Sequence, residues 1–404
     1  MTDNALRIHY IASSWPHGGT FGGQIRSLNI ARALRQIGHV HVSVVGSEAN
    51  DVEAARLTAT EFTVAHLVPG HPAPNRTLIS RVRWAFDVNY HNVHGMVACE
   101  VDRTAIVTGF ANYDLIWVMN SRTSNILQIG RWPRAHLDID DVPSTYCRSA
   151  RLSEARLGRR LKLRVQEGLL KRRESRLKHR FVTLSVCSEN DRLYLGGYPN
   201  IHVVPNGFER PRSEPVRNPV AITRIGFIGL YSYPPNLGGM NWFLTTVWPM
   251  ISSRLPHARL RLVGRDSDGP AAPSLQSVDK LGWVKDPSDE IATWSMMIVP
   301  IKQGGGTRIK IADGFSRKCP IVATSLGAFG YAVQDRVHLR IADSSEDFAN
   351  ACLGIVADPI AAKIMAEAAY KAFLAEWTWD AIALKVHAAA EDCVRRARDD
   401  SDMT

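Results

Sequence analysis

The sequence contains no run of about 18 consecutive apolar residues, the length that a helix needs to cross a bilayer. Its first residues, Met1 to Ala5, are polar and lead straight into a strand-like segment. They lack the basic and then apolar layout of a secretory signal peptide. We therefore expect no membrane-spanning helix and a cytoplasmic protein.

Cysteine is scarce, and its spacing excludes two further classes. The six cysteines are Cys99, Cys147, Cys187, Cys319, Cys352 and Cys393. No two of them form a Cys-x-x-Cys pair, which argues against a zinc site and against a disulfide framework. We expect reduced thiols and no bound metal or other cofactor.

The composition shows no low-complexity tract and no short-period repeat. A hydrophobic content of 45% and a charged content of 22% are ordinary for a globular protein, so disorder is not expected. The 404 residues exceed one ordinary core and predict two domains of roughly 200 residues each.

The charge is strongly positive, with a formal net value of +10, which implies attraction to anions. Residues 148–180 concentrate the basic side chains and interleave them with leucines. Two interpretations stay open: a solvated helix with one face on a domain core, or a basic amphipathic helix on an anionic membrane surface. Nucleic acid is not an expected partner, because this segment lacks interleaved aromatic residues and no nucleic-acid module is recognisable.

The first half of the chain predicts a parallel sheet. A strand over 6–12 runs into a loop that contains Gly18, Gly19, Gly22 and Gly23, and a helix over 24–37 leads to a strand over 41–45. This βαβ unit is the building block of parallel sheets. Further strands are predicted at 62–67, 115–119, 135–139 and 183–186.

The pattern restarts after a Pro- and Arg-rich linker at 211–219. Strands are predicted at 225–229, 260–264, 281–284, 296–301 and 321–323. Helices are predicted at 240–254, 286–294 and 310–318, and the ending, 358–398, has a helical and amphipathic pattern. The second half is therefore a second α/β domain.

Two glycine-rich places are able to cradle phosphate, since glycine lets backbone N–H groups approach closely and helix N-termini attract anions. The loop at 17–23 is the weaker, because a tight turn before a helix explains it equally well. The segment from Gly304 to Asp313 is the stronger. Arg308 and Lys310 there add positive charge for a diphosphate, and Asp313 adds a carboxylate for ribose hydroxyls.

The order of these pieces resembles the retaining GT-B glycosyltransferases of the large family four. The resemblance covers nearly the whole chain and rests on joint order and spacing. Besides the N-terminal glycine loop, the matching pieces are 203–207, 226–229, 233–236, 262–264, 281–284, 304–313, 320–324 and 327–330.

The resemblance implies an α/β fold of the GT-B type, in which two Rossmann-like domains face an interdomain cleft. It implies an N-terminal acceptor domain over 1–210, a nucleotide-sugar domain over 211–375, and a C-terminal helix over 376–404 that packs back on the first domain.

It also implies a donor site, position by position. Arg308 and Lys310 match the basic positions that hold the donor diphosphate, and Asp313 matches the acid that holds ribose. Trp283 and Val284 match the loop that reads the base, with Gly264 on the strand end beside it. The remaining donor-site positions are Gly18, Gly19, Gly22, Gly23, Gly229, Gly305, Gly306 and Thr307.

Two departures from the family pattern bear on the sugar contacts. Gly305 stands where relatives carry a glutamate that contacts the donor sugar, and Asp313 replaces a glutamate. A subgroup with a Gly-Gly-Thr-Arg-x-Lys run shares both changes. The alternative is therefore a catalytically inactive, glycosyltransferase-like protein that binds a sugar nucleotide or a glycan.

The acidic run after the predicted strand at 135–139 permits three interpretations. Asp138 and Asp140 resemble a metal-binding Asp-x-Asp pair, and the same run is suited to capping a helix. The third interpretation makes Asp140 or Asp141 an acceptor-orienting or acid/base group. GT-B enzymes need no metal, so Asp140 and Asp141 stand beside Arg308 and Lys310 as the predicted catalytic residues.

The resemblance thus predicts a metal-independent transferase that moves a sugar, with retention, from a UDP-, GDP- or dTDP-sugar to a hydroxyl of a glycan or lipid-linked glycan. The setting it implies is surface polysaccharide or glycoconjugate biosynthesis. A place on the inner face of the cytoplasmic membrane, reached through 148–180, is compatible with such an acceptor.

Overall fold

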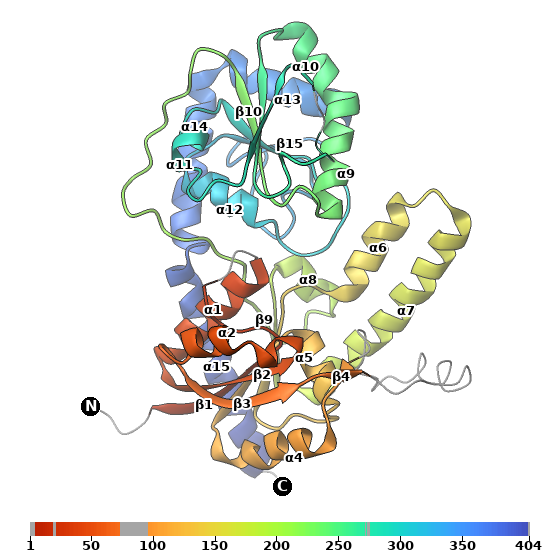
Figure 1. Ribbon diagram of the computed structural model, residues 1–404, viewed down its shortest axis with the longest axis vertical. Helices are drawn as coiled ribbons and strands as arrows, with labels where there is room; N and C mark the ends of the chain where they lie inside the picture. Colours follow the sequence, from red (N-terminus) through yellow and green to blue (C-terminus); the bar gives the residue numbers. More distant parts are fainter. Residues whose placement is uncertain (1–4, 19–21, 73–95, 271, 273–274, 403–404) are drawn as a thin grey trace. The chain divides into compact units, whose positions relative to one another are not determined.

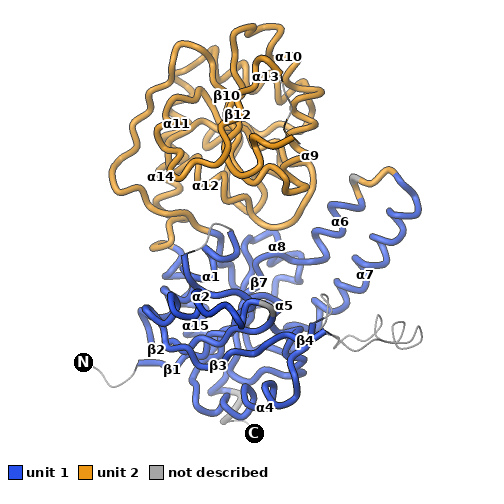
Figure 2. The backbone as a smooth tube through the Cα atoms, in the orientation of Figure 1, with its two compact units in different colours: residues 1–151, 156–206, 382–404 blue, residues 152–155, 207–381 orange. Residues whose placement is uncertain are grey.

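The computed structural model describes residues 5–18, 22–72, 96–270, 272 and 275–402. The chain divides into two compact units, which Figures 1 and 2 show. Unit 1 comprises residues 1–151, 156–206 and 382–404, and unit 2 comprises residues 152–155 and 207–381. The boundaries predicted from the sequence are 210 and 375.

Unit 1 is built on a parallel sheet with the strand order β3-β2-β1-β6-β7-β8-β9. Its strands are β1 (Leu6–Ala12), β2 (Gly38–Gly46), β3 (Thr63–Pro69), β6 (Leu115–Met119), β7 (Ala135–Ile139), β8 (Thr183–Val186) and β9 (Ile201–Val203). The central strands β6, β7 and β8 are buried along their whole length. Helices cover a parallel sheet on both faces, which is why these strands are buried and why β6 is a continuous apolar run. Strands β7 and β8 also carry buried polar side chains, among them Asp138 and Ser185.

The remaining elements of unit 1 connect or cover these strands. They are α1 (Gly22–Arg35), a 3-10 turn (Ser47–Asn50), α2 (Val52–Thr58), β4 (His71–Pro72), β5 (Met96–Val97), α4 (Glu100–Thr108), a 3-10 turn (Gly109–Asn112), α5 (Asn120–Leu127), α6 (Pro143–Ser153), α7 (Leu157–Arg180), α8 (Glu189–Tyr194) and most of α15 (Trp379–Asp402).

Unit 2 repeats the plan with the parallel strand order β12-β11-β10-β13-β14-β15. Its strands are β10 (Arg224–Ile228), β11 (Arg259–Val263), β12 (Val278–Gly282), β13 (Met296–Val299), β14 (Ile321–Ala323) and β15 (Arg340–Ile341). Its helices are α9 (Pro234–Trp242), a π-helical turn (Phe243–Val247), α10 (Trp248–Arg254), α11 (Ser288–Ala292), α12 (Ile309–Ser316), α13 (Ser345–Ala357) and α14 (Pro359–Glu376).

Two predicted boundaries in unit 2 were wrong. The helix predicted over 240–254 begins earlier, at Pro234, since proline is well suited to the first turn of a helix. The strand predicted over 281–284 is β12, which ends at Gly282 with a φ of 67°. Trp283 and Val284 therefore lie beyond the strand.

The segment 358–398, which the sequence predicted to be helical, forms two helices, because the chain breaks between α14 and α15. The carbonyl of Trp377 accepts a hydrogen bond from Phe208 N (2.9 Å), and Trp377 is buried against the rings of Phe315 and Tyr331. The predicted return of the last helix to the first domain is confirmed. His387 Nε2 lies 2.9 Å from the carbonyl of Ala33, within unit 1.

Helices α6 and α7 form a hairpin that projects from the sheet of unit 1 (Figure 1). Arg151 on α6 pairs with Glu167 on α7, with Nε and Oε2 2.7 Å apart. At the hairpin base, Ser144 N donates to Glu174 Oε1 at 2.8 Å. The basic segment predicted from the sequence is thus two antiparallel helices whose relative position is fixed by polar contacts.

No single helix of the described residues is long and apolar enough to cross a membrane. Helices α13 and α14 satisfy the length and composition test only when taken together, and they bend by 103° at their junction. Both contribute buried side chains to the core of unit 2, among them Phe348, Ile355 and Met365.

A buried ion pair joins three parts of unit 1. The guanidinium of Arg26, on α1, donates to both carboxylate oxygens of Asp138 on β7, at 3.0 and 2.6 Å. It also donates to the carbonyls of Val204 and Pro205 and to Asn206 Oδ1, at 2.9 to 3.1 Å. Neither Arg26 nor Asp138 is exposed to solvent. The pair therefore connects α1 to β7 and to the segment after β9.

We expect Arg26→Met to lower the free energy of unfolding by about 3–5 kcal/mol, because it leaves the carboxylate of Asp138 buried without its cation. Urea denaturation followed by circular dichroism measures the change. Arg56→Met is the matched control, since Arg56 forms an exposed pair with Glu53. Equal unfolding midpoints for the two variants would contradict the structural role of the pair.

Candidate functional site

The carboxyl edge of the sheet in unit 2 gathers most of the predicted donor-site residues. Strand order reverses between β10 and β13, and open parallel sheets bind ligands where such a reversal occurs. Gly229 follows β10, the loop at 300–308 follows β13, and α12 continues from that loop. Lys310 stands in the first turn of α12.

The ammonium group of Lys310 lies directly beside this reversal. Its Nζ donates to Asn236 Oδ1 at 3.0 Å, and Asn236 Nδ2 donates to the carbonyl of Leu230 at 2.7 Å. A Cβ atom added to Gly229 would lie 3.4 Å from Lys310 Nζ. Asn236 is buried at 4% exposure, so it holds the ammonium in one place.

Burial lowers the pKa of Lys310 from its usual value to about 7, and the nearby charge of Arg308 acts in the same direction. No carboxylate contributes to this shift. The group therefore changes charge near neutral pH, and an anion beside it would restore the protonated form.

Gly264, after β11, packs its backbone on that of Gly229. A Cβ atom at Gly264 would lie 2.2 Å from the carbonyl oxygen of Gly229, and the φ of Gly264 is 122°. Only glycine is compatible with both constraints. The strand ends β10 and β11 therefore meet without side chains between them, which leaves backbone close to Lys310.

Arg308 precedes α12 and is folded back on its own loop. Its Nη1 donates to the carbonyl oxygens of Gly305 and Gly306, the second at 2.9 Å. The residue is only 9% exposed. Arg308 thus shapes the glycine loop and adds positive potential to it, whereas Lys310 presents its charge at the strand reversal.

Asp313 lies one turn after Lys310 and is 8% exposed. Its carboxylate pairs with Arg317, which follows it by four residues on the same helix. Trp283 lies in the loop after β12 and is 57% exposed, while Val284 packs partly against the core. Gly305 and Thr307 are half-buried, and Gly306 is buried.

The carboxyl edge of the sheet in unit 1 carries the predicted acceptor-side acids. Asp140 Oδ1 accepts hydrogen bonds from Asn206 Nδ2 at 2.8 Å and from Cys187 Sγ at 3.3 Å. Burial raises the pKa of the Cys187 thiol well above its usual value, so the thiol stays protonated and donates. Asp140 is half-buried and Asp141 is exposed, which leaves both carboxylates accessible from solvent.

Asp138 does not join these acids. Its carboxylate is fully buried on Arg26 and accepts a further hydrogen bond from Ser185 Oγ at 2.7 Å. The interpretation of Asp138 and Asp140 as a metal-binding pair is therefore wrong, since one of them lies in the core and is already neutralised.

The N-terminal glycine loop is described only in part. Gly22 and Gly23 begin α1, and Gly18 is exposed, whereas Gly19 lies outside the described residues. A Cβ atom at Gly18 or Gly23 would meet nothing within 4 Å. Packing in this structure therefore does not explain the glycine at either position.

Two other clusters of polar residues lie away from these edges. His71, Cys99 and Asp102 place potential metal-ligand atoms within 4.8 Å of one another. Cys99 caps α4 there, and its thiol donates to Asp102 Oδ2 at 3.0 Å. The positions of Cys99 and Asp102 are therefore explained by the hydrogen bonds at the start of α4, without a metal ion.

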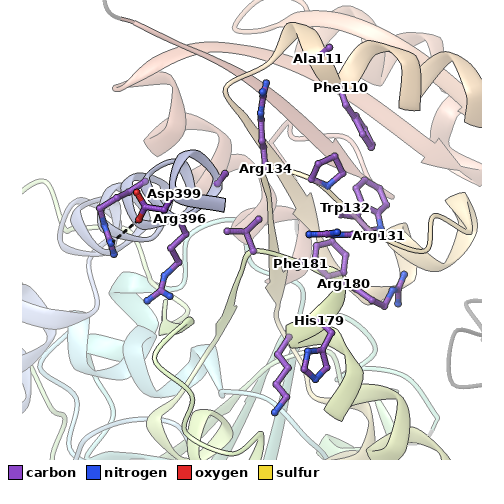
Figure 3. A pocket seen from close by; sticks show the side chains of 15 residues that line it. Phe110, Ala111, Arg131, Trp132, Arg134, His179, Arg180, Phe181, Arg396 and Asp399 are labelled. Atoms are coloured by element: carbon purple, nitrogen blue, oxygen red, sulfur yellow. Dashed lines mark ion pairs between the residues drawn. The ribbon is translucent and has the colours of Figure 1, made fainter. Parts of the chain in front are cut away.

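The second cluster surrounds a cavity of about 710 Å³ in unit 1 (Figure 3). Its lining includes Arg131 and Arg134 before β7, and Lys178 and Arg180 before β8. These positions belong to the amino ends of the strands. The cavity is therefore at the opposite edge of the sheet from Asp140, and it is separate from the chemistry predicted there.

Sequence reasoning assigned no role to Asn236 or Asn206, which orient Lys310 and Asp140. Both asparagines stood in motifs that carried the family resemblance, at 233–236 and 203–207. A side chain that hydrogen-bonds a functional group across many residues of sequence leaves no local spacing pattern. Only the folded chain reveals the pairing.

Comparison with known proteins agrees with this geometry. Residues 222–358, which span the sheet of unit 2, match the family model described as glycosyl transferases group 1. A curated protein of Klebsiella pneumoniae, described as an uncharacterized 44.6 kDa protein in the cps region, is 29% identical over 133 residues. The match covers 30% of this chain and 34% of that protein, so it spans about a third of the relative.

Solved structures resemble nearly the whole chain. Sucrose-phosphate synthase from Thermosynechococcus elongatus has a TM-score of 0.63 at 14% identity, over 95% of this chain and 98% of that one. HepE of Anabaena, in complex with UDP-glucose, has a TM-score of 0.61 at the same identity and coverage. WaaG, described as a glycosyltransferase involved in lipopolysaccharide biosynthesis, has a TM-score of 0.57 at the same identity and coverage.

These findings define the class of protein. The chain has the GT-B fold, as the sequence predicted, and its residues 222–358 match the glycosyl transferases group 1 model. The predicted family resemblance is confirmed to that extent.

The contact between Asn236 and Lys310 is testable by placing a negative charge at position 236. We expect Asn236→Asp to raise the pKa of Lys310 by at least about one unit, since a carboxylate 3 Å from an ammonium favours its charged form. NMR of reductively methylated lysines reports the titration, with Lys310→Arg identifying the resonance. Asn241→Asp, which adds the same charge to an exposed position of α9, should leave it unchanged. A similar shift in both variants would contradict the contact.

Proposed function

We propose that the protein is a glycosyltransferase that moves a sugar from a nucleotide-diphosphate donor to a hydroxyl acceptor, with retention and without a metal ion. The observation that supports it most directly is the position of Lys310. Its ammonium group lies where the strand order of a parallel sheet reverses, beside the backbone of Gly229. This place lies within the residues that match the glycosyl transferases group 1 model.

The proposed chemistry is electrostatic. Negative charge grows on the diphosphate as the bond to the sugar breaks, and fixed positive groups stabilise that charge most in the transition state. Lys310 supplies an amine that would take up a proton from solvent when the diphosphate binds, because the anion favours the charged ammonium form. Arg308 acts by holding the carbonyls of Gly305 and Gly306, so that the loop keeps its shape.

The departing phosphate is the proposed base for the acceptor hydroxyl. The hydroxyl–imidazole pairs His9–Ser43 and His136–Ser185 are fully buried and do not reach a substrate. Asp140 is the proposed acceptor-orienting group in unit 1. Its position is fixed by Asn206 and Cys187, and its carboxylate remains half-exposed. Asp313 would share its carboxylate between Arg317 and a ribose hydroxyl.

The proposed setting is the biosynthesis of a surface polysaccharide or glycoconjugate. HepE binds UDP-glucose, WaaG acts in lipopolysaccharide biosynthesis, and the Klebsiella relative lies in the cps region. We accordingly propose a UDP-sugar as the first donor to test, a glycan or lipid-linked glycan as acceptor, and a place on the inner face of the cytoplasmic membrane.

Donor binding is the first expected result. A panel of UDP-, GDP- and dTDP-sugars should contain a ligand that stabilises the protein, and a concentration of 100 times its dissociation constant contributes about 2.7 kcal/mol. Differential scanning fluorimetry measures the shift in melting temperature. Lys310→Ala should abolish it, whereas Lys302→Ala, which removes an exposed lysine of the same loop region, should not. A panel without any stabilising member would exclude the proposed donor site.

Transfer of the sugar separates an enzyme from an inactive binding protein. With the stabilising donor, we expect Lys310→Ala to reduce kcat/KM by about 10²–10³, the range seen when one preorganised group at a developing charge is lost. Release of the nucleoside diphosphate measures turnover. Binding of the donor without any release, with or without added acceptor glycans, would favour the inactive protein.

The affinity for the same donor should depend on pH through Lys310. With a pKa of about 7, the free protein is protonated there at pH 6 and mostly neutral at pH 8. We therefore expect affinity about tenfold weaker at the higher pH, with uptake of a proton on binding. Calorimetry in buffers of different ionisation enthalpy detects the proton. Lys310→Arg stays charged and should remove the dependence; unchanged affinity of the wild-type protein across this range would refute the assignment.

A further inference from the structure

The excess of positive over negative charge is confined to one projecting part of the chain. Residues 143–180, which we call the basic hairpin, contain thirteen of the 49 Lys and Arg residues and three of the 39 acidic residues. The rest of the chain therefore carries 36 residues of each sign and is neutral. The net charge of +10 belongs to α6, α7 and their connection.

The apolar residues of α7 form two rows on different faces. Leu163, Leu170 and Leu177 are spaced by seven residues, and they range from half-buried to buried at the base. Leu157 and Leu161 belong to a second row, spaced by four residues. That second row continues to Val165 and then to Leu169, which is half-buried, whereas Leu157, Leu161 and Val165 are 80%, 64% and 55% exposed. One row anchors the helix, while the other faces solvent.

The exposed row is confined to the distal half of α7. Leu152, the penultimate residue of α6, extends it across the hairpin connection at 65% exposure. Beyond Val165 the exposed positions of α7 are polar, charged or glycine. A helix of 24 residues is about 36 Å long, so the apolar row occupies the end away from the sheet (Figure 1).

Charged side chains flank this row. Arg160, Lys162 and Arg164 are exposed, and no ion pair holds any of the three within the described chain. The acids nearest the base are engaged, since Glu167 pairs with Arg151 and Glu174 accepts from Ser144. The same contacts keep α6 and α7 together, so the tip is presented by a fixed arm.

We propose that the basic hairpin docks the protein on an anionic membrane, with the distal apolar row inserted at the boundary between head groups and acyl chains. Apolar side chains flanked by Lys and Arg are suited to that boundary, because the long cationic side chains reach back to the phosphates. The inference deepens the proposed function, on which it rests for the lipid-linked acceptor. It specifies insertion of the tip, in contrast to a helix lying flat along its length.

Vesicle binding tests the docking. Sedimentation with vesicles of equal parts phosphatidylcholine and phosphatidylglycerol should bind the wild-type protein, and pure phosphatidylcholine should not. Replacing Arg160, Lys162 and Arg164 by Gln should weaken binding about a hundredfold, since each cation near an anionic surface contributes about 1 kcal/mol. Lys363→Gln with Lys371→Gln, exposed cations of α14, should leave it unchanged.

The apolar row is tested separately from the charge. The double variant Leu157→Gln, Leu161→Gln should lose at least about tenfold in affinity, because two buried leucines each contribute more than 1 kcal/mol. Leu384→Gln is the matched control, since Leu384 is 69% exposed on α15. An environment-sensitive fluorophore at Leu157→Cys, in a Cys99→Ser, Cys147→Ser background, should brighten with vesicles, while one at Arg172→Cys should not.

Three results would overturn the proposal: no sedimentation with anionic vesicles, equal binding to neutral ones, or equal losses for the Leu157/Leu161 and Leu384 variants. If the protein is retained on heparin but does not bind vesicles of either composition, the partner of the basic hairpin is a soluble polyanion and not a membrane. The stabilisation of the hairpin variants by a sugar nucleotide, measured as a shift in melting temperature, separates a failure of the docking proposal from a failure of the proposed function. If the sugar nucleotide still stabilises the protein while vesicle binding is absent, only the docking proposal fails. If the sugar nucleotide does not stabilise the wild-type protein, the proposed function fails.

Discussion

The chemistry proposed for this protein depends on one hydrogen bond, between the ammonium of Lys310 and the side-chain oxygen of Asn236. An asparagine holds the lysine without neutralising it. A carboxylate in that place would stabilise the charge permanently and compete with any incoming anion. Because the partner is an amide, the ammonium keeps a pKa of about 7 and remains available to a diphosphate.

Unit 1 shows the contrasting arrangement. Arg26 is also a buried cation near the carboxyl edge of a parallel sheet, but two oxygens of Asp138 and three further acceptors satisfy its guanidinium. No hydrogen-bonding capacity is left for a ligand, so this cation maintains the positions of α1, β7 and the segment after β9. The partner of a buried cation thus decides whether it serves stability or binding.

Much of the fold followed from periodicity, whereas the site followed only in part. Buried strands such as β6 and β13 are short apolar runs, and the glycine that ends a strand is visible in the sequence. The break between α14 and α15 was not, because it depends on Phe208 hydrogen-bonding to Trp377 over a long sequence separation. Likewise, the sequence marked Arg308 and Lys310 as equivalent cations. Folding separates them, since the guanidinium can reach its own loop carbonyls and the ammonium reaches Asn236.

The distribution of charge completes this separation of roles. In the proposed donor site, a single ammonium at a strand reversal would recognise a small anion through its position, which requires burial and a fixed partner. The basic hairpin carries exposed cations such as Arg160, Lys162 and Arg164, which no ion pair holds within the described residues, and such an array is suited to a surface whose charges are mobile and unordered. The rest of the chain has no net charge, so an anionic surface would not attract it. Confining the excess charge to one arm is therefore consistent with the proposed docking of that arm on an anionic membrane.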